Sequence, residues 1–118
     1  MSSAYCILLY SSLDVMHSSN VLVLKAFLKQ KNIIFEDIDG ALPENKNIRN
    51  VLFDLAVKQG GTREYPSVFV MKEDKSITYI GNWDRIQEYL DTESIDKATL
   101  AAHPEIVTFS SFFQWVVC

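Results

Sequence analysis

The sequence predicts an α/β domain in which a four-stranded mixed sheet carries helices on both faces, followed by a short helical extension. Two observations support this prediction. Within residues 5–39 a strand, a helix and a second strand succeed one another at lengths typical of a parallel βαβ unit with a right-handed crossover. Residues 67–90 then carry the pattern of an antiparallel hairpin and a last helix. The 118 residues suit one domain, which we place at residues 1–95, with the extension at residues 96–118.

The first strand and the first helix follow from two different apolar patterns. Residues 5–10 are almost continuously apolar, which predicts a strand buried on both faces. Residues 11–19 are polar and show no period, so we expect a loop in which Ser18 or Ser19 caps the next helix. A helix over residues 21–30 is predicted by apolar positions at spacings of three and four, namely Val21, Leu24, Phe27 and Leu28.

A turn that contains a proline separates the second strand from the second helix. Residues 33–39 begin apolar and become acidic, as expected for a strand that leaves the core. Pro43 and Glu44 suit the first turn of a helix, where a missing N–H removes no hydrogen bond. Gly60-Gly61 ends this helix because glycine adopts the left-handed cap conformation without strain. The predicted core face of the helix consists of Ile48, Val51, Leu52, Leu55 and Ala56.

Tyr65-Pro66 marks the entry of the first hairpin strand, because a proline has no N–H to give to a central ladder. This strand covers Ser67–Met71, residues 72–75 form a charged turn, and residues 77–80 return as the second strand. The last helix carries three apolar side chains, Ile86, Tyr89 and Leu90. The resulting order, β-α-β-α-β-β-α, is that of the thioredoxin fold.

The extension differs in character from the domain. Residues 92–97 are polar, residues 98–102 suit a short helical turn, and Pro104 ends it. The remaining residues carry an apolar and aromatic stripe at helical spacing, which packs either on its own domain or on a partner. At about a dozen residues this segment is too short to span a bilayer. The candidate partner-binding residues of the stripe are Phe109, Phe112, Phe113 and Trp115.

Charge and hydropathy exclude several classes of function. The formal net charge is −4 and the Lys and Arg residues do not cluster, which argues against nucleic-acid binding. The N-terminus has no basic stretch, and the apolar run at residues 5–10 is too short for a signal peptide or a membrane span. We therefore expect a cytoplasmic protein that binds no nucleic acid and spans no membrane.

The two cysteines, Cys6 and Cys118, lie at opposite ends of the chain. Neither belongs to a CxxC motif or to a Cys/His spacing, so neither a disulfide framework nor a metal site is expected. Cys6 falls within the first apolar run, where a thiol behaves as a small buried hydrophobic group.

Short motifs spread over residues 4–95 resemble one branch of the thioredoxin superfamily. These motifs are Tyr10-Ser11-Ser12, Phe27-Leu28, Ile33, Phe35-Glu36, Pro43-Glu44-Asn45-Lys46, Tyr65-Pro66, Tyr79, Gly81 and Asp84. Together they resemble the glutaredoxin branch, and within it the SH3-domain-binding glutamic-acid-rich-like proteins, small glutaredoxin-fold proteins without a CxxC motif. The chain departs from that family in lacking a proline-rich SH3-binding stretch, since its three prolines form no PxxP.

The resemblance places a former redox site in the loop after the first strand. A working glutaredoxin carries its nucleophilic cysteine there, at a helix N-terminus that stabilises the thiolate. In this chain Asp14 stands near the place of the first cysteine and His17 near that of the second. A carboxylate cannot carry out thiol–disulfide exchange, so we expect no ordinary redox reaction. Ser12 with His17 as its base is the alternative chemistry, and a solvated loop is the alternative without chemistry.

The resemblance also implies a groove beside Tyr65-Pro66. Pro66 is expected to follow a cis peptide bond that turns the backbone groups of Tyr65 outward, toward an extended peptide or glutathione. The Gly-Gly-x-Asp turn of glutaredoxins corresponds to residues 81–84, where Asn82 replaces the second glycine. The alternative is that Asp84 simply caps the last helix and that Trp83 covers the sheet edge. The candidate binding residues are therefore Tyr65, Pro66, Gly81, Asn82, Trp83 and Asp84.

The function that these features favour is a non-catalytic thioredoxin-fold adaptor that binds another protein. The contact would be the Tyr65-Pro66 edge or the C-terminal stripe. One alternative is an enzyme related to glutaredoxins or glutathione transferases that activates glutathione with Ser12 or Tyr10. Another is a structural subunit of a larger assembly. No cofactor is expected beyond weakly bound glutathione. The sequence does not decide whether the protein forms a homodimer.

Overall fold

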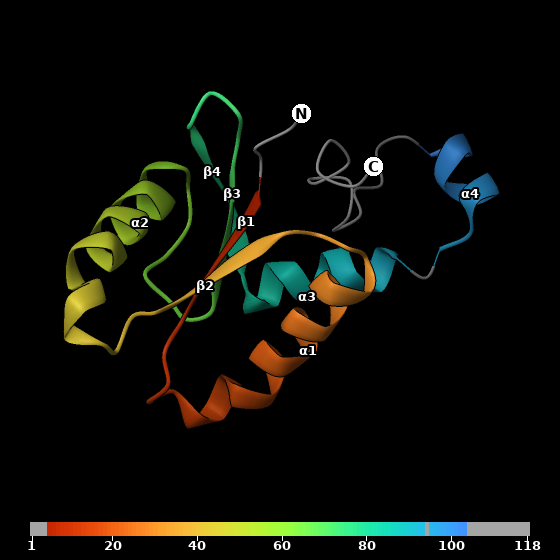
Figure 1. Ribbon diagram of the computed structural model, residues 1–118. Coiled ribbons are helices and arrows are strands. Elements are labelled where there is room, and N and C mark those ends of the chain that lie inside the picture. Colours follow the sequence, from red (N-terminus) through yellow and green to blue (C-terminus); the bar gives the residue numbers. More distant parts are fainter. Residues whose placement is uncertain (1–4, 94, 104–118) are drawn as a thin grey trace.

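A four-stranded mixed sheet forms the centre of the protein, as Figure 1 shows for the computed structural model, which describes residues 5–93 and 95–103. The strands are β1 (Tyr5–Tyr10), β2 (Phe35–Asp39), β3 (Ser67–Met71) and β4 (Ile77–Asn82), in the order β2-β1-β3-β4. β1 and β2 are parallel, whereas β3 runs antiparallel to both β1 and β4. The predicted mixed α/β class is confirmed, and this strand order is compatible with a thioredoxin-like arrangement.

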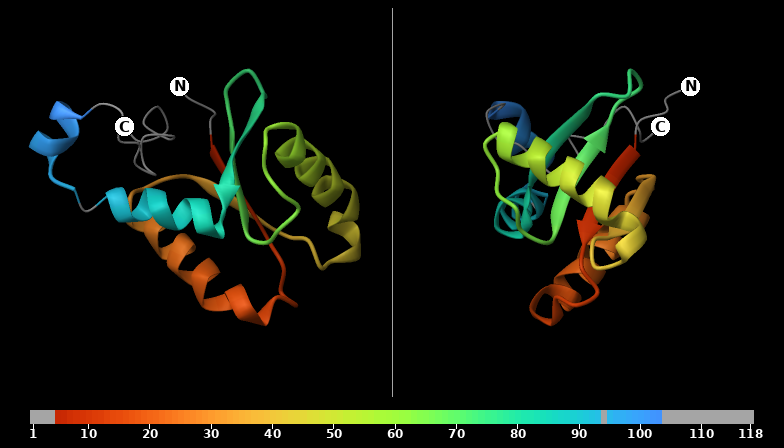
Figure 2. Two further views of the ribbon diagram at one scale, coloured as in Figure 1. Left: turned by 180° about the vertical axis from the view of Figure 1, so that it is seen from behind. Right: turned by 90° about the vertical axis from the view of Figure 1, so that its left-hand side faces the viewer.

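Helices cover both faces of the sheet, as predicted. α1 (Ser18–Gln30) and α3 (Trp83–Thr92) lie together on one face, and α2 (Lys46–Lys58) lies on the other (Figures 1 and 2). Two short 3-10 helices, η1 (Val15–His17) and η2 (Pro43–Asn45), precede α1 and α2 respectively, and α4 (Lys97–Ala102) follows α3. None of the helices in the described part of the chain has both the length and the apolar character that a membrane span requires.

The core consists of two layers that share β1. Cys6 and Leu8 face α1 and α3, whereas Ile7 and Leu9 face α2. All four side chains are at most 3% exposed, which confirms that β1 is buried on both faces. The residues that α1 and α3 contribute to their layer are Val21, Leu24, Leu28 and Ile86. On the other face the layer is completed by Leu52, Phe53, Ala56, Phe69 and Tyr79, among others.

The predicted core face of α2 is partly wrong. Leu52 and Ala56 are buried as predicted, but Val51 is 55% exposed, and Phe53, which was left out, is buried. The cause is that apolar residues occupy nearly the whole middle of this helix, so the spacing alone does not select one side. The ring of Phe53 packs against that of Tyr65 at a centroid distance of 5.2 Å, which explains why this side faces the sheet.

The start of α1 also differs from the prediction. Residues 11–19 were expected to form a loop with a serine cap, yet η1 occupies Val15–His17 and α1 begins at Ser18. The N-cap position is His17, and its side chain makes no capping hydrogen bond. Both the backbone N–H and the hydroxyl group of Ser18 donate to the carbonyl of Val15, so the preceding 3-10 turn replaces the expected serine cap.

The end of α2, the first hairpin strand and the extension agree with the prediction where the structure describes them, whereas β4 (Ile77–Asn82) continues two residues beyond the predicted strand at residues 77–80. Gly60 has a φ angle of +87° and ends α2 in a Schellman turn, in which Gly61 N–H donates to Ala56 C=O at 2.7 Å. β3 has the predicted bounds, and α4 covers the predicted turn at residues 98–102. The aromatic stripe with Phe109, Phe112, Phe113 and Trp115 lies outside the described residues.

Candidate functional site

Four loops gather at one end of the sheet. The carboxyl ends of β1, β2 and β4 meet the amino end of β3 there, because Ser67 pairs with both Leu9 and Asn82, and Tyr10 pairs with Asp39. This topology brings the loops after β1 and β2, the segment before β3 and the turn after β4 to the same end. The predicted site residues on these loops are Ser12, Asp14, His17, Tyr65, Pro66, Asn82, Trp83 and Asp84.

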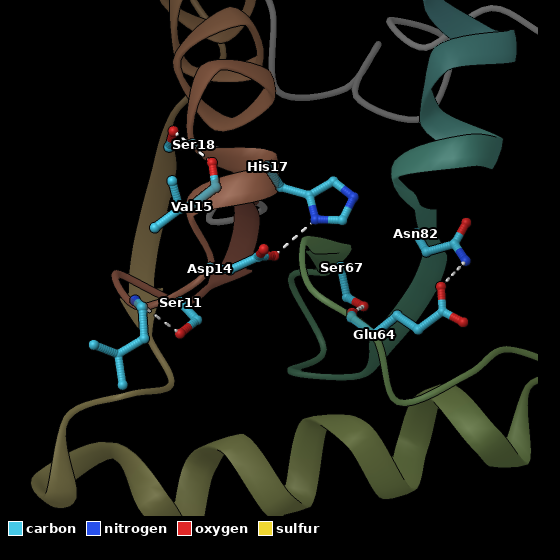
Figure 3. A network of polar contacts seen from close by, with 9 residues as sticks. Ser11, Asp14, Val15, His17, Ser18, Glu64, Ser67 and Asn82 are labelled. Atoms are coloured by element: carbon cyan, nitrogen blue, oxygen red, sulfur yellow. Dashed lines mark hydrogen bonds and ion pairs between the residues drawn. The ribbon is translucent and has the colours of Figure 1, made fainter.

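Asp14 and His17 form a pair in the loop after β1. The Nδ1 atom of His17 lies 2.7 Å from Asp14 Oδ2, and the two side chains are 29% and 24% exposed. A carboxylate only accepts hydrogen bonds, so Nδ1 is the donor and the imidazole is held in one orientation. Figure 3 shows this ring pointing from the loop toward the strands that carry Ser67 and Asn82.

The alternative nucleophile, Ser12, is not activated by this pair. Its backbone N–H donates to Asp39 Oδ1 at 3.0 Å, and among the described residues no hydrogen bond joins Ser12 to His17. A serine nucleophile requires a base within hydrogen-bonding distance. The structure therefore gives no support to a Ser12–His17 catalytic arrangement.

Asp39, which sequence analysis did not select, fixes the position of the loop. Its Oδ1 atom accepts hydrogen bonds from the N–H groups of Ser12 and Ala41, both at 3.0 Å, and the residue is only 9% exposed. Burial pushes the pKa of Asp39 upward, but the hydrogen bonds from Ser12 and Ala41 outweigh burial and hold the pKa below its ordinary value. The sequence does carry a signal for this role of Asp39. An aspartate followed by glycine at the end of a strand, here Asp39-Gly40, indicates an Asx turn.

Replacing Asp39 should destabilise the protein in a pH-dependent way. Asp39→Ala leaves two N–H groups without their acceptor, so we expect the free energy of unfolding at pH 7 to fall by about 1–3 kcal/mol. Asp39→Asn keeps an acceptor oxygen and removes only the charge. Because the folded-state pKa is depressed, the stabilisation by the charge is present above about pH 4 and is lost as the pH falls through the folded-state pKa. In urea denaturation, the stability difference between wild type and Asp39→Asn should therefore narrow from pH 7 to pH 2.5. An equal difference at both pH values would contradict this account.

The Tyr65-Pro66 bond is cis, as predicted, and Pro66 is buried. The Tyr65 ring packs on Phe53 and crosses over Gly40, where any Cβ atom would overlap the tyrosine hydroxyl group. Within the described residues the backbone N–H and C=O groups of Tyr65 form no hydrogen bond.

The turn after β4 has a different cap from the predicted one. Asn82, not Asp84, is the N-cap of α3, and its Oδ1 accepts a hydrogen bond from the N–H of Arg85 at 3.3 Å. Its amide nitrogen donates to Glu64 Oε2 at 3.0 Å, which ties the turn to the segment before β3 (Figure 3). Asp84 is exposed in the first turn of α3, where the helix dipole favours a negative charge. Trp83 is half-buried and packs against the core layer under α1 and α3.

Three apolar side chains of the loop after β1 project into solvent. Leu13, Val15 and Met16 are 80%, 81% and 83% exposed, the highest values among the large apolar residues described. We call these three residues the apolar loop. Sequence analysis missed it because the polar character of residues 11–19 drew attention to chemistry and away from the apolar residues between the polar ones. Leu22 and Val23 extend the exposed apolar surface along α1, seven residues after Val15 and Met16.

The remaining donors and acceptors do not assemble a metal site. Over residues 5–93 and 95–103, no group of three or more His, Cys, Asp or Glu side chains is arranged to hold a metal ion. Cys6 is the second residue of β1 and pairs with Phe35 on β2 and Val70 on β3, so it lies near the opposite end of the sheet from the candidate site. Burial raises the pKa of the free Cys6 thiol.

No protein-family model, curated protein or solved structure matches the chain. The class of protein is therefore defined by the fold and the site alone. It is a mixed α/β protein whose loops at one sheet end present a buried aspartate, an Asp–His pair and an exposed apolar loop.

Proposed function

We propose that this protein is a non-catalytic adaptor of the thioredoxin fold that binds another protein through the sheet end. The observation that carries the proposal is the exposure of Leu13, Val15 and Met16 where redox relatives carry a reactive thiol. An exposed apolar group beside the polar Asp14–His17 pair is typical of a surface that a partner covers.

Three features support the thioredoxin fold. The strand order, the placement of α1 and α3 opposite α2, and the cis bond before Pro66 all agree with the expectation from sequence. The narrower likeness to the SH3-domain-binding glutamic-acid-rich-like proteins rests on the motif resemblance alone. Polyproline recognition is not part of the proposal, because the chain has no PxxP sequence.

The chemistry of the site favours binding over catalysis. Thiol–disulfide exchange needs an accessible thiolate, yet Cys6 is 0% exposed and its pKa is raised. The loop that would hold the thiol presents the Asp14–His17 pair instead.

The apolar loop can supply a useful share of binding free energy. Full burial of one side chain of this size is worth about 1.5–3 kcal/mol, and these three are almost fully exposed before binding. The cost of ordering the loop is reduced, because Asp39 holds Ser12, η1 occupies Val15–His17 and the Asp14–His17 pair joins the two ends of the turn. A preorganised apolar loop is therefore well suited to insert into a partner.

One observation favours glutathione as a second ligand class. The N–H and C=O groups of Tyr65, which have no hydrogen-bond partner among the described residues, can pair with the backbone of a glutathione molecule as well as with that of a peptide. Against the enzyme alternative, no hydrogen bond joins Ser12 to His17 among the described residues, and the Ser12 side chain interacts with Asp39, whose lowered pKa makes it a weak base. Glutathione therefore enters the test below as a competitor.

The test is a quantitative pull-down from cells that express the protein. Leu13→Ser, Val15→Ser and Met16→Ser are combined in one variant, which should fold with wild-type stability because all three positions are exposed. We expect at least a tenfold loss of the specifically recovered partner, which corresponds to about 1.4 kcal/mol.

A matched variant carries three serines at exposed apolar positions on other parts of the fold. Ile34, Val51 and Val57 are 65%, 55% and 49% exposed, and their replacement should leave the recovered partner unchanged. Equal recovery by the two variants would refute the apolar loop as the binding surface. Loss of the partner in millimolar glutathione, together with a change in Trp83 fluorescence, would favour the glutathione-binding alternative.

A further inference from the structure

The outer edge of β4 is occupied by a side chain instead of a strand. Among the described residues, β4 is the last strand of the sheet and pairs only with β3. The edge of a sheet presents unpaired N–H and C=O groups that readily pair with another strand. Here the N–H of Tyr79 donates to Gln59 Oε1 at 2.8 Å, and the C=O of Ile77 accepts from Gln59 Nε2 at 3.2 Å.

The side-chain amide of Gln59 reproduces what a peptide group would offer. It has one acceptor oxygen and N–H donors, the same groups that an added strand presents to an edge. By bridging residues 77 and 79 it satisfies both outward-facing groups on either side of Thr78. The position otherwise open to a neighbouring strand is therefore filled from within the chain.

The backbone that carries Gln59 is held firmly, but its side chain is not. Gln59 is the C-cap of α2, and its N–H donates to the carbonyls of Leu55 and Ala56 at 3.1 and 3.2 Å. The Schellman turn then brings Gly61 against the Tyr79 ring, where any Cβ would overlap the ring. The side chain of Gln59 itself is exposed. It can leave the edge by rotation alone, without unfolding of α2.

We infer that Gln59 occupies a strand-pairing site for a second copy of this chain, and that its displacement opens β4 to antiparallel pairing with β4 of that copy. The edge is self-complementary. A two-fold axis at Thr78 sets Ile77 opposite Tyr79 of the second copy, and the same outward N–H and C=O groups then pair across the axis.

Two other features of β4 restrict the pairing to the segment around Thr78. Ile80 is an extra residue relative to β3, since Tyr79 pairs with Phe69 and Gly81 with Val68, and such a bulge interrupts a regular edge. At the hairpin tip, residues 72–75 are all charged, and charged side chains at a sheet edge disfavour pairing with another strand.

The test combines amide exchange with measurement of mass in solution. In Gln59→Ala at low concentration, the Tyr79 amide should exchange at least tenfold faster than in the wild type, because it has lost its acceptor. At high concentration the variant should dimerise, as measured by light scattering and sedimentation, and the Tyr79 amide should become protected again. The wild type should stay monomeric over the same range.

Three further variants make the test specific. Gln87→Ala removes an exposed glutamine from α3, which makes no edge contact, and should behave as the wild type. Adding Thr78→Lys to Gln59→Ala places two positive charges opposite each other at the axis and should abolish the dimer. Should Gln59→Ala not fold, Gln59→Glu keeps an acceptor for Tyr79 but has no N–H for Ile77, and should dimerise in the same way.

Two results would overturn the inference. Unchanged exchange of the Tyr79 amide in Gln59→Ala would show that the side chain does not close the edge. Faster exchange without concentration-dependent dimerisation would show that the opened edge is not a pairing site for a second copy.

Discussion

Replacement of Phe69 by alanine should lower the free energy of unfolding by about 3–5 kcal/mol, the largest effect expected for any single side chain of the sheet. Phe69 is 0% exposed at the centre of β3, and its ring packs against that of Tyr79 at a centroid distance of 5.5 Å. It belongs to the layer between the sheet and α2. The loss would be a large part of the stability of a domain this small, because typical values are about 5–15 kcal/mol.

Chemical denaturation followed by circular dichroism measures this loss. The matched control is Phe35→Ala, since Phe35 is also an aromatic strand residue but is half-buried at the edge strand β2. Phe35→Ala should lower the free energy of unfolding by less than half as much as Phe69→Ala. Equal losses at the two positions would mean that the α2 side of the sheet is not a closely packed core.

The central strands were predictable because their signals are local and strong. β1 and β3 are short apolar runs bounded by polar or proline residues, so pattern and length together indicate buried strands. The C-terminal end of α2 was equally predictable from the sequence, because Gly60 takes a positive φ angle that other residues adopt only with strain. The face of α2 was not predictable, because apolar residues surround much of the helix and only contact with Tyr65 and the sheet selects Phe53.

At the candidate site, sequence analysis located the loops but not the interactions that hold them. Asp39 and Ser12 are 27 positions apart, and nothing local in the sequence announces their hydrogen bond. Asn82 and Asp84 are both good N-cap residues, so the choice depends on how far β4 extends before α3 begins. Gly60 and Gly61 indicate that Gln59 ends a helix, but the contact of its side chain with β4 follows only from the tertiary packing of the end of α2.

The thiol of Cys6 should react with an alkylating reagent at least a thousandfold more slowly in the native protein than in denaturant. The reactive species is the thiolate, and both the 0% exposure of Cys6 and its raised pKa oppose formation of that species. Reaction then requires the sheet to open, and a thousandfold protection corresponds to an opening free energy of about 4 kcal/mol. The measurement is made by mass spectrometry in a Cys118→Ser background, so that Cys6 is the remaining thiol.

The control for this prediction is Leu13→Cys in a Cys6→Ala, Cys118→Ser background, which places a thiol in the apolar loop at a position that is 80% exposed. That thiol should react at a rate close to that of an unfolded peptide. The adaptor proposal depends on the contrast between the reaction rates of these two thiols. Cys6 is four residues before the end of β1, which places it about 13 Å from the sheet end at the rise of a strand. Native-state labelling of Cys6 as fast as that of the Leu13→Cys thiol would mean that the sheet exposes a reactive sulfur, and the case against redox chemistry would fail.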